Sequence, residues 1–243
     1  MVSPPNAAHT RHVRLAVLLG FVVLGVVFWS SPVLTPLKLL VVMMHETGHA
    51  LATFAVGGRV DQVVVGLDES GACLSRLPPS FFGSVVVYSA GYLGSILASA
   101  LLLTWTFRFG RARLLLSLIC VWLVAMAFFL AGNPLTLGFC LATAAVLGVC
   151  ARFLKPALLE WLTLFIAAFS GLYAVLDLRD DLWNSAVRSQ SDAALLAQVT
   201  HVPALFWAIL WTAASLLMFG WILRWAWRAG PAQPLTRVPL QNR

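Results

Sequence analysis

Long apolar segments recur along this chain, and residues that end helices or form turns separate them. A helix that spans a membrane needs roughly 20 predominantly apolar residues. Seven segments come close to this requirement, namely 15–30, 36–56, 84–106, 114–131, 134–152, 157–177 and 203–225. The sequence therefore predicts an all-α, multi-pass integral membrane protein with about six or seven transmembrane helices.

Composition supports the membrane class. Hydrophobic residues make up 60% of the chain and charged residues only 10%, whereas soluble domains carry about 25% charged residues. The 16 basic residues outnumber the 9 acidic ones, but most stand at the ends of apolar segments, as Arg111 and Lys155 do. This placement is typical of topology determinants and gives no basic stripe for nucleic acid, so the predicted surroundings are the lipid bilayer. We expect one membrane domain over 1–230 and a disordered basic tail over 231–243.

Two stretches differ from the apolar segments. In residues 57–80, Val60, Val63 and Val65 lead into the turn-forming sequence Asp68-Glu69-Ser70-Gly71. Residues rich in β-branched side chains before such a turn predict a small membrane-associated β-hairpin. The stretch 178–202 is polar and mixed, and it predicts a loop that contains a short helix.

Orientation is only partly fixed by the basic residues. The basic segments 107–113 and 152–155 and the C-terminal tail fall on one side, which the positive-inside rule assigns to the cytoplasm. Seven crossings would then place the N-terminus outside, despite Arg11 and Arg14. Either these two charges are overruled or one early segment does not cross the membrane.

The segment 36–56 contains the pattern His45-Glu46-Thr47-Gly48-His49. On a helix, His45 and His49 project one turn apart from the same face, so both imidazoles can bind one metal ion. Glu46 lies on the adjoining face, where it can accept a proton from a water activated by zinc. A charged side chain at the centre of a spanning helix costs about 2.5–3.5 kcal/mol, and a metal compensates that cost. The alternative is a buried hydrogen-bond cluster or a proton relay.

A catalytic zinc usually has three protein ligands, and the nine acids of the chain limit the choice of the third. Asp177, Asp180 and Asp181 share one helical face about 100° wide, and only Asp177 follows a wholly apolar turn. We therefore expect Asp177 to be the third ligand. Asp180, Asp181 and Asp192 remain alternatives.

Several motifs resemble those of the site-2 proteases, a family of intramembrane zinc metallopeptidases. The sequence 45–50 resembles the family's HExGHA motif. The stretch 89–95 is similar to its AGPxxN-like segment, with Tyr92 in place of Pro and Ser95 in place of Asn. Leu176-Asp177-Leu178 matches the family's LDG motif in part, because the Gly is missing. The stretch Ser191-Asp192-Ala193, with His201 and Trp207 beyond it, is similar to the compact bacterial branch.

The resemblance implies a zinc metallopeptidase of the bacterial inner membrane that cleaves membrane proteins in or near their transmembrane segments. His45, His49 and Asp177 would bind zinc, and Glu46 would be the general base. From topology alone, we further hypothesise that the predicted hairpin receives an unwound substrate strand by edge pairing. The alternatives are a non-catalytic metal-binding scaffold or transporter-like protein and a zinc-dependent lipid or small-molecule hydrolase. Glu46 favours an enzyme, because a transport site needs ligands but no base between them.

Overall fold

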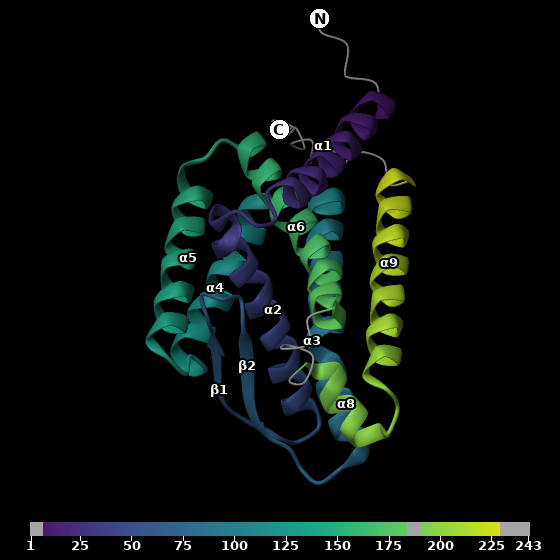
Figure 1. The fold of residues 1–243 in the computed structure, drawn as a ribbon. Coiled ribbons are helices and arrows are strands. Elements are labelled where there is room, and N and C mark those ends of the chain that lie inside the picture. Colours follow the sequence, from purple (N-terminus) through teal and green to yellow (C-terminus); the bar gives the residue numbers. More distant parts are fainter. Residues whose placement is uncertain (1–6, 184–190, 229–243) are drawn as a thin grey trace, which may run out of the picture.

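A computed structural model of the chain describes the backbone of residues 7–183 and 191–228 and the side chains of 16–176, 191–221 and 224. The helices are α1 (Ala7–Val27), the 3-10 helix η1 (Pro32–Leu34), α2 (Thr35–Ala55), α3 (Phe81–Phe109), α4 (Ala112–Phe129), α5 (Pro134–Phe153), α6 (Pro156–Trp183), α8 (Asp192–Thr200) and α9 (Ala204–Arg228). The strands are β1 (Arg59–Val65) and β2 (Gly71–Arg76). The predicted all-α fold with one small hairpin is confirmed (Figure 1). The tail 231–243 lies outside the described residues.

Five of the described helices are long and apolar enough to cross a membrane: α3, α4, α5, the part Pro156–Leu176 of α6, and the part Ala204–Trp221 of α9. The chain is therefore an integral membrane protein. The predicted spans 15–30 and 36–56 correspond to α1 and α2, and neither is among these five. In α2 the polar side chains of the motif lower the hydropathy. The described apolar part of α1, Ala16–Val27, is short.

The first two helices follow one another in the same direction (Figure 1). Helix α1 runs parallel to α6, since Phe21 meets Phe165 and Trp29 meets Tyr173, with ring centroids 5.1 and 5.5 Å apart. Helix α2 runs antiparallel to α3, and the short connections from α3 to α6 make those four helices alternate in direction. The start of α1 therefore lies at the same end as the α3–α4 and α5–α6 connections. One early segment thus makes no full crossing of its own, which removes the conflict with Arg11 and Arg14.

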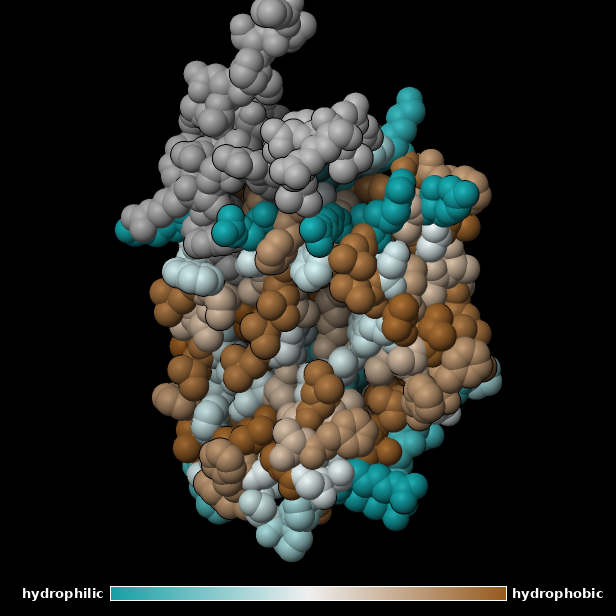
Figure 2. All heavy atoms as spheres, turned by 180° about the vertical axis from the view of Figure 1, so that it is seen from behind, coloured by the Kyte–Doolittle hydropathy of each residue, from teal (hydrophilic) through white to brown (hydrophobic). Residues whose placement is uncertain are grey.

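Basic residues gather at that end of the bundle. Arg111 and Arg113 lie at the α3–α4 connection, and Arg152 and Lys155 lie at the α5–α6 connection. The Arg113 guanidinium donates a hydrogen bond of 2.8 Å to the Ala151 carbonyl and so links the two connections. Figure 2 shows hydrophobic residues over the middle of one face and hydrophilic residues toward its two ends. This distribution is the one that a membrane-spanning bundle requires.

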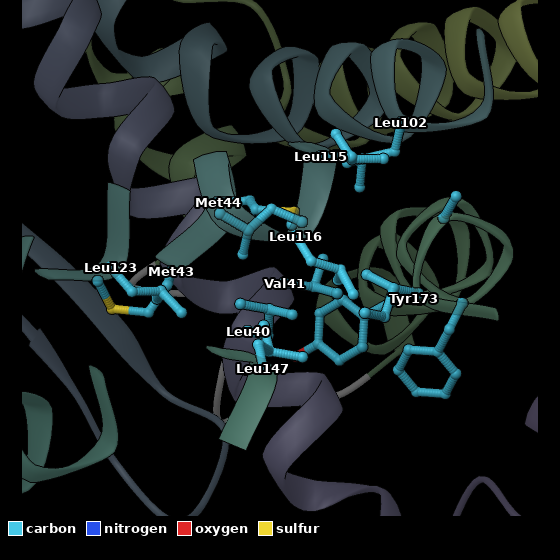
Figure 3. Packing of buried hydrophobic residues seen from close by; sticks show 14 of the residues in the cluster. Leu40, Val41, Met43, Met44, Leu102, Leu115, Leu116, Leu123, Leu147 and Tyr173 are labelled. Atoms are coloured by element: carbon cyan, nitrogen blue, oxygen red, sulfur yellow. The ribbon is translucent and has the colours of Figure 1, made fainter. Parts of the chain in front are cut away.

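Helix α2 carries the HExxH pattern through the middle of the core. Val41 and Met43 are completely buried, as are Leu116 and Leu123 of α4 (Figure 3). Pro36 lies in the first turn of α2, where its missing N–H breaks no helical hydrogen bond. Because α2 is enclosed by other helices, its polar side chains face protein groups rather than lipid.

The hairpin is anchored along β1. The Val63 amide donates to the Leu130 carbonyl (2.6 Å), and the Val63 carbonyl accepts from the Gly132 amide (2.8 Å). The Val65 amide donates to the Thr136 hydroxyl at the start of α5 (2.9 Å). Strand β1 thus pairs with β2 on one edge and with the segment after α4 on the other. This arrangement places β2 at the edge of the two-stranded sheet.

Candidate metal centre

Helix α2 brings two imidazoles together. The Nε2 atoms of His45 and His49 lie 3.1 Å apart, and the ring centroids lie 4.9 Å apart. This confirms the pairing that the helical spacing predicts. Glu46 follows His45 directly, and only 4% of its surface is exposed. A short stretch of one helix therefore supplies two nitrogen ligands and a buried carboxyl group.

Helix α3 fixes the orientation of the second imidazole. His49 Nδ1 lies 2.7 Å from the Val87 carbonyl oxygen, to which it donates a hydrogen bond. That bond places the ring proton on Nδ1 and leaves the Nε2 lone pair toward His45. A histidine that binds metal almost always has its other ring nitrogen held in this way.

Helix α8 brings an acid to the pair. The Ser191 hydroxyl accepts a hydrogen bond of 3.3 Å from the Ala194 amide and so caps the helix, which places Asp192 in its first turn. Asp192 Oδ2 lies 3.1 Å from His45 Nε2 and 3.0 Å from His49 Nε2. Within the described part of the chain, these three residues are the one group of His, Cys, Asp or Glu side chains that could share a metal ion, with ligand atoms within 4.8 Å.

Among the described side chains, the geometry brings Asp192, which the sequence had left as an alternative, to the two histidines. Asp177, Asp180 and Asp181 lie in the last turns of α6, and their side chains fall outside the described ones. The prediction for Asp177 is therefore untested by direct observation. One sequence signal pointed to Asp192: it is the single acid of the mainly apolar segment 191–199, directly after a capping serine.

A small aromatic cluster holds α8 against the bundle. Tyr92 of α3 stacks on Trp211 of α9, with centroids 4.9 Å apart and ring planes 28° apart. The same tyrosine meets the His45 ring edge-on, with centroids 4.8 Å apart. The buried cluster comprises Tyr92, Ala193, Leu196, Ala208 and Trp211. The position of Asp192 thus depends on packing between α3, α8 and α9.

Three glycines allow the elements around the site to approach closely. A Cβ atom on Gly91 would contact the Nε2 atoms of both imidazoles, and one on Gly94 would lie 3.0 Å from the Gly48 Cα. Helices α2 and α3 therefore approach one another closely at Gly91 and Gly94. A Cβ atom on Gly71 of β2 would contact the Glu46 carboxylate. The backbones of α2 and α3 therefore meet at Gly48 and Gly94, while α3 and β2 leave no room for a further methyl group beside the imidazoles and Glu46.

The donor set suits zinc. Two imidazole nitrogens and one carboxylate oxygen are ligands that catalytic zinc takes, with a fourth position left for water or substrate. Burial alone raises the pKa of the Asp192 carboxyl, but the adjacent imidazoles of His45 and His49 lower that pKa below its usual range. The carboxylate is the form of an aspartate that binds a divalent cation.

A cavity of about 570 Å³ adjoins the three side chains. One wall carries His45, Glu46 and His49, and the segment Ser70–Ser75 of the hairpin forms another. Helices α3, α6 and α8 complete the lining with Tyr88, Tyr92, Tyr173 and Leu195. The cavity thus joins the candidate ligands to the edge strand β2 and to apolar and aromatic walls.

A family model described as Peptidase M50B-like matches residues 18–222. The chain belongs to this family. The M50B-like match spans both histidines of α2 and Asp192 of α8, and it confirms the resemblance to the site-2 proteases. Comparison with curated proteins and with solved structures gave no match.

Two other polar residues of this M50B-like chain, Asn133 and His201, lie at helix ends and not at the metal centre. Asn133 caps α5 by accepting a hydrogen bond of 2.7 Å from the Thr136 amide, in the turn between α4 and α5. His201 ends α8 in the left-handed conformation, with φ of 58°, and is exposed. Neither belongs to the group of candidate ligands.

Proposed function

We propose that this protein is an intramembrane zinc metallopeptidase that hydrolyses peptide bonds in or near the transmembrane segments of membrane proteins. The convergence of His45, His49 and Asp192 beside the buried Glu46 carries the proposal. Membership of a peptidase family supports peptide hydrolysis over the scaffold and transporter alternatives. We further propose that the protein lies in a bacterial inner membrane with its basic end in the cytoplasm.

The proposed zinc ligands are His45 Nε2, His49 Nε2 and Asp192 Oδ2. The Val87 carbonyl holds His49 in the tautomer that binding needs, and the Tyr92 ring limits how far His45 can turn. Zinc, when bound, supplies a Lewis acid that polarises the scissile carbonyl and activates water near neutral pH. The remaining chemistry belongs to side chains of this chain.

Glu46 is the proposed general base. It belongs to no ligand group, and its carboxylate packs against Gly71 at the cavity wall. From this position it takes the proton of the attacking water and passes it to the leaving amine. Helix α2 and strand β2 enclose the carboxylate and hold it in one place, so its proton transfers need little rearrangement.

Strand β2 is the proposed docking edge for the substrate. A helical substrate hides its carbonyl groups in intrahelical hydrogen bonds, so the cleaved segment has to be extended. An extended segment can pair with an exposed sheet edge. The outer edge of β1 is already paired, and β2 lines the cavity next to Glu46. These contacts support delivery of a peptide bond to the site along β2.

The test is cleavage of candidate single-span membrane proteins by the purified, zinc-loaded protein in lipid vesicles. Replacement Glu46→Gln should reduce turnover by about 100-fold or more and keep the zinc, because the base is lost while the ligands remain. A zinc chelator should stop cleavage by the unaltered protein. Glu160→Gln, at an acid of α6 outside the cavity lining, serves as the control and should cleave normally. Unchanged turnover in Glu46→Gln would overturn the proposal.

A further inference from the structure

A buried lysine lies on the same helix as the histidines, outside the candidate metal centre. Lys38, near the start of α2, is only 5% exposed. Its ammonium group lies 2.8 Å from the Glu69 carboxylate and 4.4 Å from the centre of the Trp29 ring. Glu69 is part of the hairpin turn, 31 residues further along the chain. The pair therefore ties the start of the motif helix to the tip of the hairpin.

Burial makes this ion pair sensitive to the loss of either partner. A charge removed from water needs an opposite charge and hydrogen bonds, and deletion of one partner leaves the other charge uncompensated. The Lys38 side chain is 7% exposed and the Glu69 side chain 29%. Lysines in membrane helices commonly extend their ammonium groups to the water interface. The Lys38 ammonium group instead extends toward the Glu69 carboxylate of the hairpin.

The hairpin turn that carries Glu69 has an unusual backbone conformation and is held by several hydrogen bonds. Glu69 has a φ of 68°, in the left-handed region that non-glycine residues rarely adopt. Next to it, the Asp68 carboxylate accepts hydrogen bonds from the Ser70 amide (3.2 Å) and hydroxyl (2.6 Å). An unfavourable backbone conformation persists only where the surroundings enforce it. Here the Glu69 amide donates to the Gly66 carbonyl (3.1 Å) and the Gly66 amide donates to the Ser70 carbonyl (2.8 Å), so the hydrogen bonds of the turn hold this conformation and place the Glu69 side chain toward Lys38.

The turn also sets the position of β2. Gly71 stands two residues after Glu69 and is the first residue of β2. A Cβ atom on Gly71 would contact both Glu46 and Val42 of α2, so the strand has no spare room there. Glu69 and Gly71 both line the cavity. A shift of the hairpin tip therefore moves the edge strand relative to the proposed base.

We propose that Lys38 and Glu69 are positioning residues that hold the edge strand β2 against the metal cavity so that an extended substrate can pair with it. This inference rests on the proposed peptidase function. Neither residue belongs to the candidate ligands or acts as the base. Loss of the pair should therefore weaken substrate binding rather than metal binding.

A second ion pair of the same hairpin gives a matched control. Asp61 and Arg76 lie 2.7 Å apart at the other end of the strands, and their side chains are 33% and 78% exposed. Solvent-exposed pairs contribute little. Variants that break the two pairs therefore differ in burial and in distance from the cavity. Asp61→Asn also removes a longer, exposed ion pair of 3.9 Å between Asp61 and Arg59, so the control loses no fewer charge contacts than Glu69→Gln.

The experiment measures amide hydrogen exchange of residues 66–75, zinc content, KM and kcat for four variants. Lys38→Met and Glu69→Gln should speed exchange of the hairpin by about 10-fold or more, because its tip is released. They should raise KM by roughly 5- to 10-fold, with kcat within about 2-fold and zinc retained. Lys38→Arg, which keeps the charge, and Asp61→Asn should behave as the unaltered protein.

Equal exchange in Glu69→Gln and Asp61→Asn, or a loss of zinc in Glu69→Gln with an unchanged hairpin, would overturn the inference. Glu69→Gln keeps the size of a partly exposed side chain, so it answers the question even if Lys38→Met does not fold. Hydrogen exchange needs no substrate. If the unaltered protein cleaves nothing, the proposed function fails while the exchange result still reports whether the pair holds the strand.

Discussion

At the residue scale, the site depends on glycines, which have no side chain, as much as on the side chains of the candidate ligands. Gly91 leaves the space beside the two imidazoles open, and Gly71 leaves space beside Glu46. The sequence predicted the histidine pair because their separation along a helix fixes their direction. It left Asp192 only as an alternative for the third position, because Asp192 comes 147 residues after His45 and no local period links them. Depth within an apolar helix favoured Asp177, whereas tertiary packing brings Asp192 to the histidines.

Replacement of Gly91 by alanine tests this space directly. The added Cβ atom would contact both Nε2 atoms, so the rings would have to move and zinc affinity should fall by roughly 10- to 100-fold. Gly138→Ala on α5 is the control, since a Cβ atom there has nothing within 4 Å. Titration of the metal-free proteins with zinc gives the affinities. Equal affinities for the two variants would show that the rings have more room than the structure gives them.

At the element scale, the short helix α8 places Asp192 beside the two histidines. The sequence predicted a short helix in this polar stretch, and the Ser191 cap explains where it begins. Its docking could not be predicted, because the cluster that holds it joins side chains from three separate helices. The hairpin, in contrast, could be read from local sequence, since its β-branched strands and acidic turn are contiguous.

Removal of an aromatic ring from this cluster should weaken zinc binding without touching a ligand. Trp211→Leu removes the surface on which Tyr92 stacks, so α8 and Asp192 should become less fixed and zinc affinity should fall by about 10-fold. Trp221→Leu, at a residue of the same helix that is 61% exposed, is the control. Both affinities come from the same zinc titration. A normal affinity in Trp211→Leu would mean that other contacts position α8.

At the scale of the whole molecule, hydropathy predicts the apolar segments but not the direction in which each of them runs. Length and hydropathy identify the helices from α3 to α6 and α9, and turn residues such as Asn133 separate them. The same criteria do not reveal that α1 and α2 run in the same direction. That fact depends on side-chain contacts such as the pairing of Trp29 with Tyr173. The structure thereby removes the conflict between seven full crossings and the N-terminal arginines.

This arrangement predicts where chain positions lie relative to the membrane. The start of α1 and Gly110 should face one compartment, and Val202, between α8 and α9, should face the other. Single cysteines at Ala8, Gly110 and Val202, in a chain whose native cysteines are replaced by alanine, can be labelled with an impermeant maleimide from either side. Labelling of Ala8→Cys and Val202→Cys from the same side would contradict the predicted direction of α1 and α2.

The zinc content of two aspartate variants tests the central claim most directly. The purified protein should hold about one zinc per chain, bound by His45, His49 and Asp192. Asp192→Asn should lower zinc affinity by roughly 10-fold or more, because an anionic ligand becomes a neutral amide, whereas Asp177→Asn should keep the metal. Elemental analysis of both variants after dialysis against a weak chelator gives the answer. Loss of zinc in Asp177→Asn with full occupancy in Asp192→Asn would contradict the account.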